Sequence, residues 1–307
     1  MILVFIIAIV VLLLSIACYL FVFYSPKPRK GAAKRKPFGN QYTKYWDRIL
    51  KHICELEEMP CERVWITSHD GKKLFGRLYE IKENAPIVLC FHGYRSFGLR
   101  DFCTSVSCFG EMGFNVLVVD ERAQGESGGH TMTMGLKEER DCEEWIRYVV
   151  SRFGTDCHIA LAGVSMGGSV VLMASGAELP DNVKCILADS PYSSAKEQFE
   201  SLLHAFKLPA KPFYAFISMS ARLWAGLKLS DCDVRYSIAK THLPILVIHG
   251  LEDRFVSSAM SRKLHDEYPD KFRLELFENA GHALSYFEDE DRYKRIIGEF
   301  LKNNFEE

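Results

Sequence analysis

Residues 159–168 read Ile-Ala-Leu-Ala-Gly-Val-Ser-Met-Gly-Gly, an apolar run that passes directly into a Gly-x-Ser-x-Gly motif. The bare pentapeptide is a weak signal, because glycine makes up about 7% of residues and roughly one chain in ten of this length contains the motif by chance. Its setting makes it specific, since a serine on a sharp strand-to-helix turn needs a strained backbone and nearby glycines. The setting predicts Ser165 as a nucleophile and the Met166 backbone N–H as an oxyanion donor.

A serine hydroxyl needs a general base, and the base needs an orienting carboxylate. Among the ten histidines, His282 has the most suitable setting, in the loop that follows the last predicted strand. His130, in the loop after an earlier strand, is the alternative. The loop after the strand at 244–248 offers Asp253 as the carboxylate, with its neighbour Glu252 as the alternative.

The second oxyanion donor is expected in the loop after the first buried parallel strand. There the chain reads Cys-Phe-His-Gly-Tyr-Arg-Ser at residues 90–96. Gly93 permits a tight turn, and the next backbone N–H, that of Tyr94, then faces the nucleophile. The simplest interpretation of the Tyr94 ring is that it forms a wall of the pocket.

Strand-like and helix-like segments alternate on both sides of these motifs, as in a parallel sheet covered by helices on both faces. A hairpin comes first, with strands at Arg63–Ser68 and Leu74–Ile81 around an Asp-Gly turn. Buried strands are predicted at Pro86–Phe91, Phe114–Val119, His158–Val164, Val183–Ala188, Pro244–Ile248 and Phe272–Phe277. Helices are predicted at Asp101–Met112, Leu136–Phe153, Met166–Ser175, Ser257–Tyr268 and Glu290–Leu301.

One segment, at about residues 193–240, departs from this alternation. Its apolar residues recur at spacings of three and four, which predicts a helical insertion, or cap, in place of another strand-helix unit. Much of this apolar surface must pack internally. An insertion at the carboxyl edge of a parallel sheet would also overhang the place where such sheets bind ligands.

At these residues the chain resembles the α/β-hydrolase superfamily, and within it the lysophospholipase-like or Bem46-like branch, which overlaps in pattern with serine aminopeptidase S33-type domains. The resemblance covers about residues 63–303 and rests on six motifs: Phe91–Gly93, Asp120–Gly128, Gly163–Gly167, Ala188–Tyr192, His249–Asp253 and Ala280–His282. It implies a mainly parallel eight-stranded sheet, a cap between strands six and seven, and Ser165, Asp253 and His282 as a catalytic triad. The order of these three residues along the chain is also that of the superfamily.

The segment at 120–128 reads Asp-Glu-Arg-Ala-Gln-Gly-Glu-Ser-Gly and carries glycines like those of a phosphate loop. We expect Asp120 and Arg122 instead to hold loops near the site. Ala123 stands where many relatives carry glycine or another residue, and we expect this difference to alter only the local loop.

The first 24 residues predict a transmembrane anchor. From Ile2 to Tyr24 there is no charged side chain, and a helix of that length crosses a hydrocarbon core of about 30 Å. Nine basic residues and one acid, Asp47, follow in residues 25–51: Lys27, Arg29, Lys30, Lys34, Arg35, Lys36, Lys44, Arg48 and Lys51. The positive-inside rule then predicts that the rest of the chain is cytoplasmic.

A cleaved signal peptide is the alternative, although such peptides normally begin with a basic region and have a shorter apolar core.

Residues 25–60 form a basic linker with an amphipathic helix, whose apolar residues recur at helical spacing from Tyr42 to Leu56. This helix either lies on anionic lipid or docks on the domain that follows, at 61–307. Residues 52–307 carry 29 basic and 39 acidic residues, a charge that disfavours nucleic acid as a partner.

Nine of the ten cysteines lie outside the anchor, an odd number that cannot all pair within one chain, which favours the cytoplasm. The chain has no Cys-x-x-Cys pair, so we expect no structural zinc.

These features together predict a membrane-anchored serine hydrolase that cleaves carboxylic esters through an acyl-enzyme. The apolar cap and the anchor favour lipid-like or other hydrophobic acyl esters, and the chemistry requires no metal or organic cofactor. Three alternatives remain open. They are a serine peptidase or amidase, a thioesterase on the same fold, and a non-catalytic scaffold tethered to the membrane.

Overall fold

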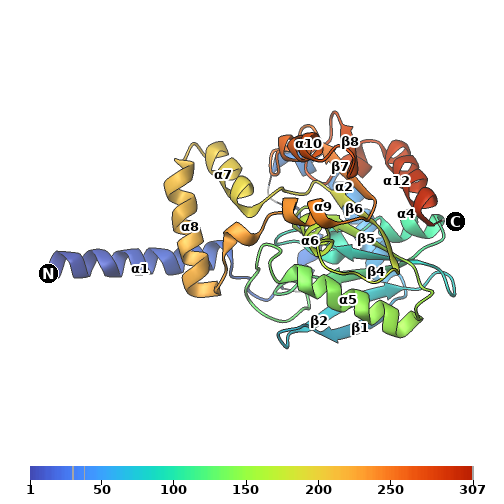
Figure 1. Ribbon diagram of the computed structural model, residues 1–307, viewed down its shortest axis with the longest axis horizontal. Coiled ribbons are helices and arrows are strands. Elements are labelled where there is room, and N and C mark those ends of the chain that lie inside the picture. The colour runs from blue at the N-terminus through green and yellow to red at the C-terminus, as the bar shows by residue number, and fades with distance from the viewer. Residues whose placement is uncertain (30, 38, 306–307) are drawn as a thin grey trace.

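The computed structural model of the chain describes residues 1–29, 31–37 and 39–305. Lys30 of the basic flank and the last two residues of the predicted hydrolase domain lie outside the described residues. An eight-stranded sheet forms the centre of the molecule, in the order β1-β2-β4-β3-β5-β6-β7-β8 (Figure 1). Its strands are β1 (Glu62–Thr67), β2 (Lys73–Tyr79), β3 (Ile87–Phe91), β4 (Asn115–Asp120), β5 (Ile159–Val164), β6 (Val183–Asp189), β7 (Ile245–Gly250) and β8 (Phe272–Phe277).

Six neighbouring strands run in the same direction, so their carboxyl ends lie along one edge of the sheet. β2 runs antiparallel to both of its neighbours, β1 and β4, whereas β4, β3, β5, β6, β7 and β8 are parallel. The predicted fold class, an α/β-hydrolase architecture with a mainly parallel sheet, is therefore confirmed. Each strand begins and ends within two residues of its predicted bounds. The carboxyl ends of the six parallel strands meet at the edge where such sheets bind ligands.

Helices lie on both sides of the sheet. The helices of the structure, of which α1, α7 and α8 project away from the sheet, are α1 (Ile2–Val22), α2 (Trp46–Glu58), α3 (Gly98–Asp101), α4 (Ser105–Glu111), α5 (Glu138–Phe153), α6 (Met166–Ala174), α7 (Ala195–Ala205), α8 (Ala210–Ala225), α9 (Arg235–Lys240), α10 (Ser258–Glu267), α11 (Ser285–Glu288) and α12 (Glu290–Phe305). Short 3-10 turns occur at Ala32–Lys34, Asn40–Tyr42 and Leu229–Asp231.

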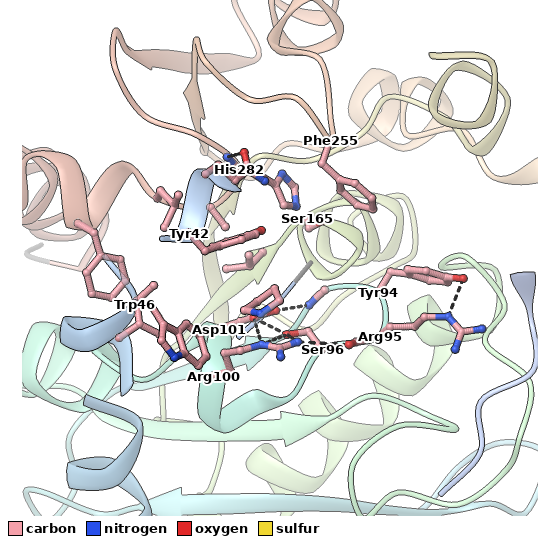
Figure 2. Close-up of a pocket in the computed structure, with 18 residues that line it drawn as sticks. Tyr42, Trp46, Tyr94, Arg95, Ser96, Arg100, Asp101, Ser165, Phe255 and His282 are labelled. Atoms are coloured by element: carbon pink, nitrogen blue, oxygen red, sulfur yellow. Dashed lines mark hydrogen bonds and ion pairs between the residues drawn. The ribbon is translucent and has the colours of Figure 1, made fainter. Parts of the chain in front are cut away.

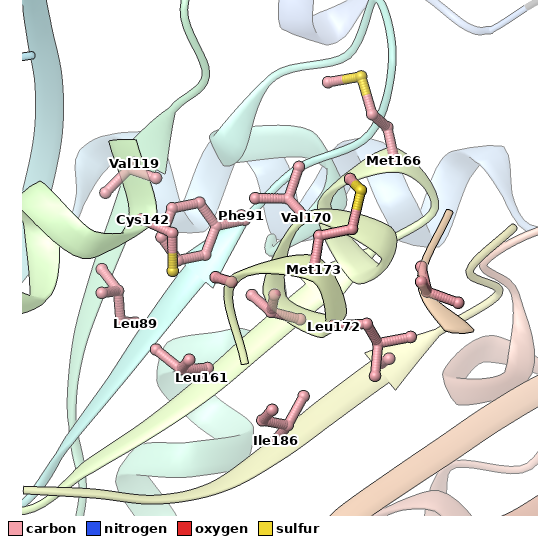
Figure 3. Packing of buried hydrophobic residues seen from close by; sticks show 14 of the residues in the cluster. Leu89, Phe91, Val119, Cys142, Leu161, Met166, Val170, Leu172, Met173 and Ile186 are labelled. Atoms are coloured by element: carbon pink, nitrogen blue, oxygen red, sulfur yellow. The ribbon is translucent and has the colours of Figure 1, made fainter. Parts of the chain in front are cut away.

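The core forms against both faces of the sheet. Every residue of β3 is buried, and alternate side chains enter different clusters. Leu89 and Phe91 join Val170 and Met173 of α6 and Cys142 of α5 on one face (Figure 3). Helices α4 and α12 contribute to the cluster on the other face. A strand covered on both faces requires a continuous apolar run, which is why this segment of the sequence does not alternate.

One predicted helix is divided in two. The stretch at 101–112 forms the end of α3 and then α4, because the backbone leaves helical geometry at Phe102 (φ −114°, ψ 27°). Asp101 is thereby left at the end of α3, where its carboxylate accepts the Gly93 N–H (2.8 Å) and the Ser96 hydroxyl. These tertiary contacts override the local helical periodicity.

Helix α2 docks on the domain. Its apolar residues Ile49, Ile53 and Leu56 are buried, and the first two share a cluster with Tyr286 and Phe287 of α11. Of the two alternatives for this amphipathic helix, docking is the one that the structure shows.

Helix α1 projects away from the body (Figure 1) and is long and apolar enough to cross a membrane. The residues that follow it are instead part of the body. Phe23 is completely buried in the main core, Met132 N–H donates to its carbonyl (2.9 Å), and Ser25 N–H donates to His130 O (2.8 Å). The segment after α1 is therefore held by backbone pairing as well as by packing.

The predicted insertion is helical. It consists of α7, α8, a 3-10 turn and α9, and no strand interrupts it among the residues described. Helices α7 and α8 project from the body on the side where α1 emerges (Figure 1).

Candidate active site

Ser165 lies on a strained turn between β5 and α6. Its backbone has φ 56° and ψ −118°, and its N–H donates to Asp189 O (2.8 Å). A Cβ atom on Gly167 would lie 1.9 Å from the Phe91 carbonyl oxygen, and one on Gly163 would lie 2.2 Å from Gly167 O. Because neither clash can be relieved by rotating a side chain, both glycines of the motif are required by backbone contact.

Two backbone donors lie beside Ser165 without a partner. A Cβ atom on Gly93 would lie 3.1 Å from Ser165 Cβ, so the loop that continues into Tyr94 passes directly alongside the serine. Neither the Tyr94 N–H nor the Met166 N–H donates a hydrogen bond to another described residue. Unpaired N–H groups placed in this way can stabilise an oxyanion on a substrate.

The loop that carries Tyr94 is held on one side by residues of α3. Asp101 accepts the Gly93 N–H, and the Arg100 guanidinium donates to the hydroxyl of Ser96 (2.9 Å). From the other side, the Tyr94 hydroxyl donates to Val22 O at the end of α1 (2.6 Å). The Tyr94 ring therefore also ties the loop to α1, in addition to lining the cavity.

Asp253 is a buried carboxylate, and both of its oxygens accept hydrogen bonds. Oδ1 accepts the N–H groups of Phe255 (2.8 Å) and Val256 (2.9 Å), and Oδ2 accepts the Nδ1–H of His282 (2.7 Å). Burial by itself would raise the pKa of Asp253. The charge and hydrogen bonds of His282 and His249 outweigh burial and hold that pKa well below its usual range, so Asp253 is ionised.

His282 is oriented by this carboxylate. Burial by itself would lower the pKa of His282, but the charge and hydrogen bond of Asp253 outweigh it and raise that pKa above 6.5. The ring packs against Phe255, with 5.1 Å between centroids, and the backbone N–H donates to Gln41 Oε1 (3.2 Å). Because Nδ1 is bound to Asp253, Nε2 remains for the cavity that His282 and Ser165 both line (Figure 2). The Ser165 hydroxyl makes no hydrogen bond to a described residue.

The two alternative residues lie elsewhere. The His130 ring stacks on Tyr24, with 5.6 Å between centroids, and contacts Ser25 O (3.2 Å). The Glu252 side chain is 61% exposed and faces Arg254. Of the sequence-predicted residues, the structure thus brings together Ser165, Tyr94, Met166, Asp253 and His282, and leaves His130 and Glu252 apart.

His249 is a further residue near the site that sequence reasoning missed as a partner of Asp253, because a histidine at the end of an apolar strand does not by itself indicate a contact with a carboxylate. The His249 side chain is completely buried, with Nε2 3.3 Å from Asp253 Oδ2 and 3.1 Å from Val256 O. Its Nδ1 pairs with the Ser261 hydroxyl (2.7 Å). The four-residue spacing between His249 and Asp253, across one tight loop, is the signal that could have found it.

The cavity around Ser165 has a volume of about 340 Å³. Its walls include Pro37, Gln41, Tyr42, Trp46 and Ile49, which belong to the N-terminal linker and α2. Among the described residues, none of the lining side chains comes from the cap at 193–240, so the predicted overhang of the cap is not found at this cavity. Residues of the linker occupy that position instead.

Tyr42 closes part of this wall (Figure 2). Burial raises its pKa far above the usual value, and the nearby carboxylates of Asp101 and Asp253 raise that pKa further. Tyr42 is therefore a neutral phenol at all physiological pH values.

Arg122 and Asp120 hold the neighbouring loops, as the sequence predicts. The Arg122 guanidinium donates to Asp141 (2.6 Å) and Asp70 (3.0 Å), and Asp120 accepts the Gly98 N–H (3.2 Å). Within the part of the chain that the structure describes, no cluster of three or more histidine, cysteine or acidic side chains is arranged to hold a metal.

Comparisons with known proteins agree on the fold. The model of the prolyl oligopeptidase family matches residues 100–307. The uncharacterised protein YqkD of Bacillus subtilis is 28% identical over 218 residues, which cover 71% of each chain. The AB hydrolase superfamily protein YisY of the same organism is 24% identical over 257 residues, covering 72% of this chain and 93% of YisY. The esterase Pf2001 of Pyrococcus furiosus superposes with a TM-score of 0.67 at 24% identity, covering 92% of this chain and 98% of the esterase.

These matches confirm the α/β-hydrolase superfamily. They do not reach the finer lysophospholipase-like, Bem46-like or S33-type branch, which stays a prediction.

The close backbone contact at the turn that carries Ser165 predicts how a methyl group added at Gly167 affects stability. Because a Cβ at position 167 would overlap the Phe91 carbonyl oxygen, we expect Gly167→Ala to lower the free energy of unfolding by more than about 3 kcal/mol. In Gly298→Ala, on α12, the new methyl meets no atom closer than 3.6 Å and adds about 0.5–1 kcal/mol of stability through helix propensity. Denaturant unfolding of both variants, as the full chain in detergent, checks the contrast. Equal stability of Gly167→Ala and the parent would contradict it.

Proposed function

The chain belongs to the prolyl oligopeptidase family, and from this premise we propose that it is a membrane-anchored serine hydrolase of carboxylic esters. The observation that carries the proposal is the hydrogen bond from His282 to the ionised Asp253, because His282 lines the same cavity as Ser165 and Tyr94. The backbone N–H groups of Tyr94 and Met166, beside Ser165, have no partner among the described residues. This arrangement contains every group that acyl transfer through a serine requires.

In the proposed mechanism, His282 Nε2 takes the Ser165 hydroxyl proton while Oγ attacks the carbonyl carbon of the ester. The negative charge moves to the carbonyl oxygen, which accepts the N–H groups of Tyr94 and Met166. The imidazolium, stabilised by Asp253, then gives its proton to the departing alcohol, and an acyl-enzyme remains. Water, deprotonated by the same Nε2, attacks this ester, and the carboxylic acid leaves as Ser165 recovers its proton.

The lining of the cavity favours an uncharged, apolar acyl group. Tyr42, Trp46, Phe255 and Phe287 supply aromatic walls, and about 340 Å³ falls at the small end of ligand pockets. A lipid-like or other hydrophobic acyl ester fits these walls. The sequence resemblance to lysophospholipase-like hydrolases forms part of this proposal.

A peptidase or amidase is the second candidate, because the matching family model is that of an oligopeptidase. A free amino terminus would need an available carboxylate near Ser165. Asp101 is the acidic side chain that lines the cavity, and it already accepts the Gly93 N–H and the Ser96 hydroxyl, while Arg95 and Arg100 line the same space. This balance of charge disfavours an ammonium group and favours a neutral ester.

Contacts at the end of α1 support a retained anchor over a cleaved signal sequence. Arg95 Nη2 donates to Phe21 O (2.8 Å) and Tyr24 O (2.9 Å), so its cation caps the carboxyl end of α1. Removing the chain up to this point would also expose the core site filled by Phe23. The basic linker after α1 favours a cytoplasmic position for the catalytic domain.

Covalent labelling tests the nucleophile. We expect a fluorophosphonate to label the full chain in detergent, and Ser165→Ala to lose the label and at least about a thousandfold in kcat on p-nitrophenyl esters. A matched control is Ser230→Ala, at an exposed position of the cap. Full activity in Ser165→Ala would overturn the mechanism.

The pH dependence tests the roles of His282 and Asp253. Because Nε2 must be neutral to accept a proton and Asp253 raises the pKa of His282, kcat/KM should fall with decreasing pH, with a midpoint above the ordinary pKa of a histidine. Asp253→Asn should lower kcat by about 10⁴ and move this acid limb to lower pH, since burial then dominates the pKa of His282. Glu252→Gln, in the same loop, should change neither quantity. A larger loss in Glu252→Gln than in Asp253→Asn would reverse the assignment.

The side of the membrane is tested with intact cells that express the full chain. We expect a protease added outside to leave the region after Pro37 uncut, because the basic flank directs that region to the cytoplasm. Permeabilised cells provide the control, in which the same protease must reach and cut the domain. Digestion in intact cells would place the domain outside.

A further inference from the structure

An exposed apolar surface lies on the hairpin formed by α7 and α8. We call it the cap patch, and its members are Phe206, Leu208, Phe213, Met219, Leu223 and Trp224. Beyond residue 22, the described residues include ten large hydrophobic side chains that are exposed, and six of them lie here. Phe206 is 74% and Leu223 60% exposed. Such a concentration of apolar surface marks an interaction site.

The cap patch is continuous with α1. The Ser220 hydroxyl of α8 donates to Ser15 O (2.7 Å), and Trp224 Nε1 donates to the Ser15 hydroxyl (3.0 Å). Both serines are completely buried at this contact, and small residues of this kind let two helices approach closely inside a membrane. Any apolar medium that surrounds α1 therefore also reaches the exposed side of α8.

The crossing geometry fixes the orientation of α8. Figure 1 shows α8 running across α1 instead of along it. If α1 stands close to the membrane normal, as the proposed anchor requires, α8 lies close to the plane of the membrane. Ser15 is seven residues from the end of α1 at Val22, which is about 10 Å along the helix. Helices that lie in a membrane interface bury their apolar face to a depth of about 5–10 Å.

The charge of the hairpin fits an anionic lipid surface. Residues 201–230 contain four basic side chains and no acidic one, whereas the body of the protein is acidic. Lys207 and Lys211 are exposed just before and at the start of α8, and Arg222 is exposed near its end. Basic side chains around an exposed apolar face are typical of helices that bind anionic lipid. The same four charges would oppose contact with a second copy of this surface.

We propose that the cap patch is embedded in the membrane interface, with lipid acyl chains and anionic headgroups as its partner. This inference rests on the proposed anchor and goes beyond it, because α8 becomes a second membrane element and the body is held at a fixed height and orientation. The aromatic and aliphatic side chains of the patch enter the acyl region, and the lysines meet the headgroups.

Fluorescence quenching by lipids brominated on their acyl chains tests the proposal, with the full chain in vesicles of phosphatidylcholine and phosphatidylglycerol. Three variants each add one tryptophan, and quenching is measured as the difference from the parent. Phe5→Trp reports on α1 and Phe213→Trp on the cap patch. Tyr236→Trp is the control, at a 67% exposed position on α9 outside the patch. We expect the first two reporters to be quenched and the third to be unaffected.

The outcomes separate this proposal from the anchor. Quenching of Phe5→Trp without quenching of Phe213→Trp would overturn the proposal and leave the anchor standing. No quenching of either would overturn both, and quenching of all three would remove the assignment to the cap patch.

A charge introduced into the patch provides a second measurement. Leu223→Glu should reduce the quenching of the Phe213→Trp reporter by at least about half, because a carboxylate is costly to bury in lipid. The Phe5→Trp signal should not change. Tyr236→Glu, which adds the same charge outside the patch, should change neither signal. An equal response to the two glutamates would contradict the proposal.

Discussion

The carboxyl edge of the sheet depends on one backbone contact, the approach of Gly167 at the start of α6 to the carbonyl oxygen of Phe91 at the end of β3. This contact presses the turn at Ser165 against the loop that follows β3. It therefore brings the unpaired N–H groups of Tyr94 and Met166, from separate parts of the chain, to one side of the serine. The strained backbone of Ser165 is maintained because β5 is paired on both sides in the middle of the sheet.

The loop after β7 stabilises a buried charged carboxylate, that of Asp253. A buried ion is costly unless hydrogen bonds replace its hydration. Three of the four groups that face the Asp253 carboxylate come from residues 249–256, namely the His249 ring and the N–H groups of Phe255 and Val256. This segment therefore supplies most of the hydrogen bonds that replace the hydration of its own carboxylate. His282 is the partner that comes from another loop, so its position is the one that the rest of the fold must supply.

The strands, and the placement of the candidate site residues at one edge of the sheet, could be predicted because they depend on local signals and on topology. Apolar runs bounded by turn residues mark the strands, and parallel strands place the loops that carry Ser165, Asp253 and His282 along one edge. The linker over the cavity could not be predicted in this way. The amphipathic pattern of α2 shows that it packs, but not where, and the hydrogen bond from His282 to Gln41 joins residues 241 apart without any local mark in the sequence. His249 was missed for a related reason, since a histidine at the end of a strand does not by itself indicate a carboxylate contact, and only its four-residue spacing from Asp253 points to one.

The hydrogen bonds of Tyr94 and Arg95 at the end of α1 connect this helix directly to the loop after β3. Tyr94 and Arg95 donate to the carbonyl oxygens of Phe21, Val22 and Tyr24, and the Tyr94 N–H that lies beside Ser165 belongs to the same pair of residues. A change in the tilt of α1 would therefore be transmitted to this loop. For the anchor proposed above, a bilayer of different thickness would have to deform around α1, or the whole domain would have to rotate with the helix.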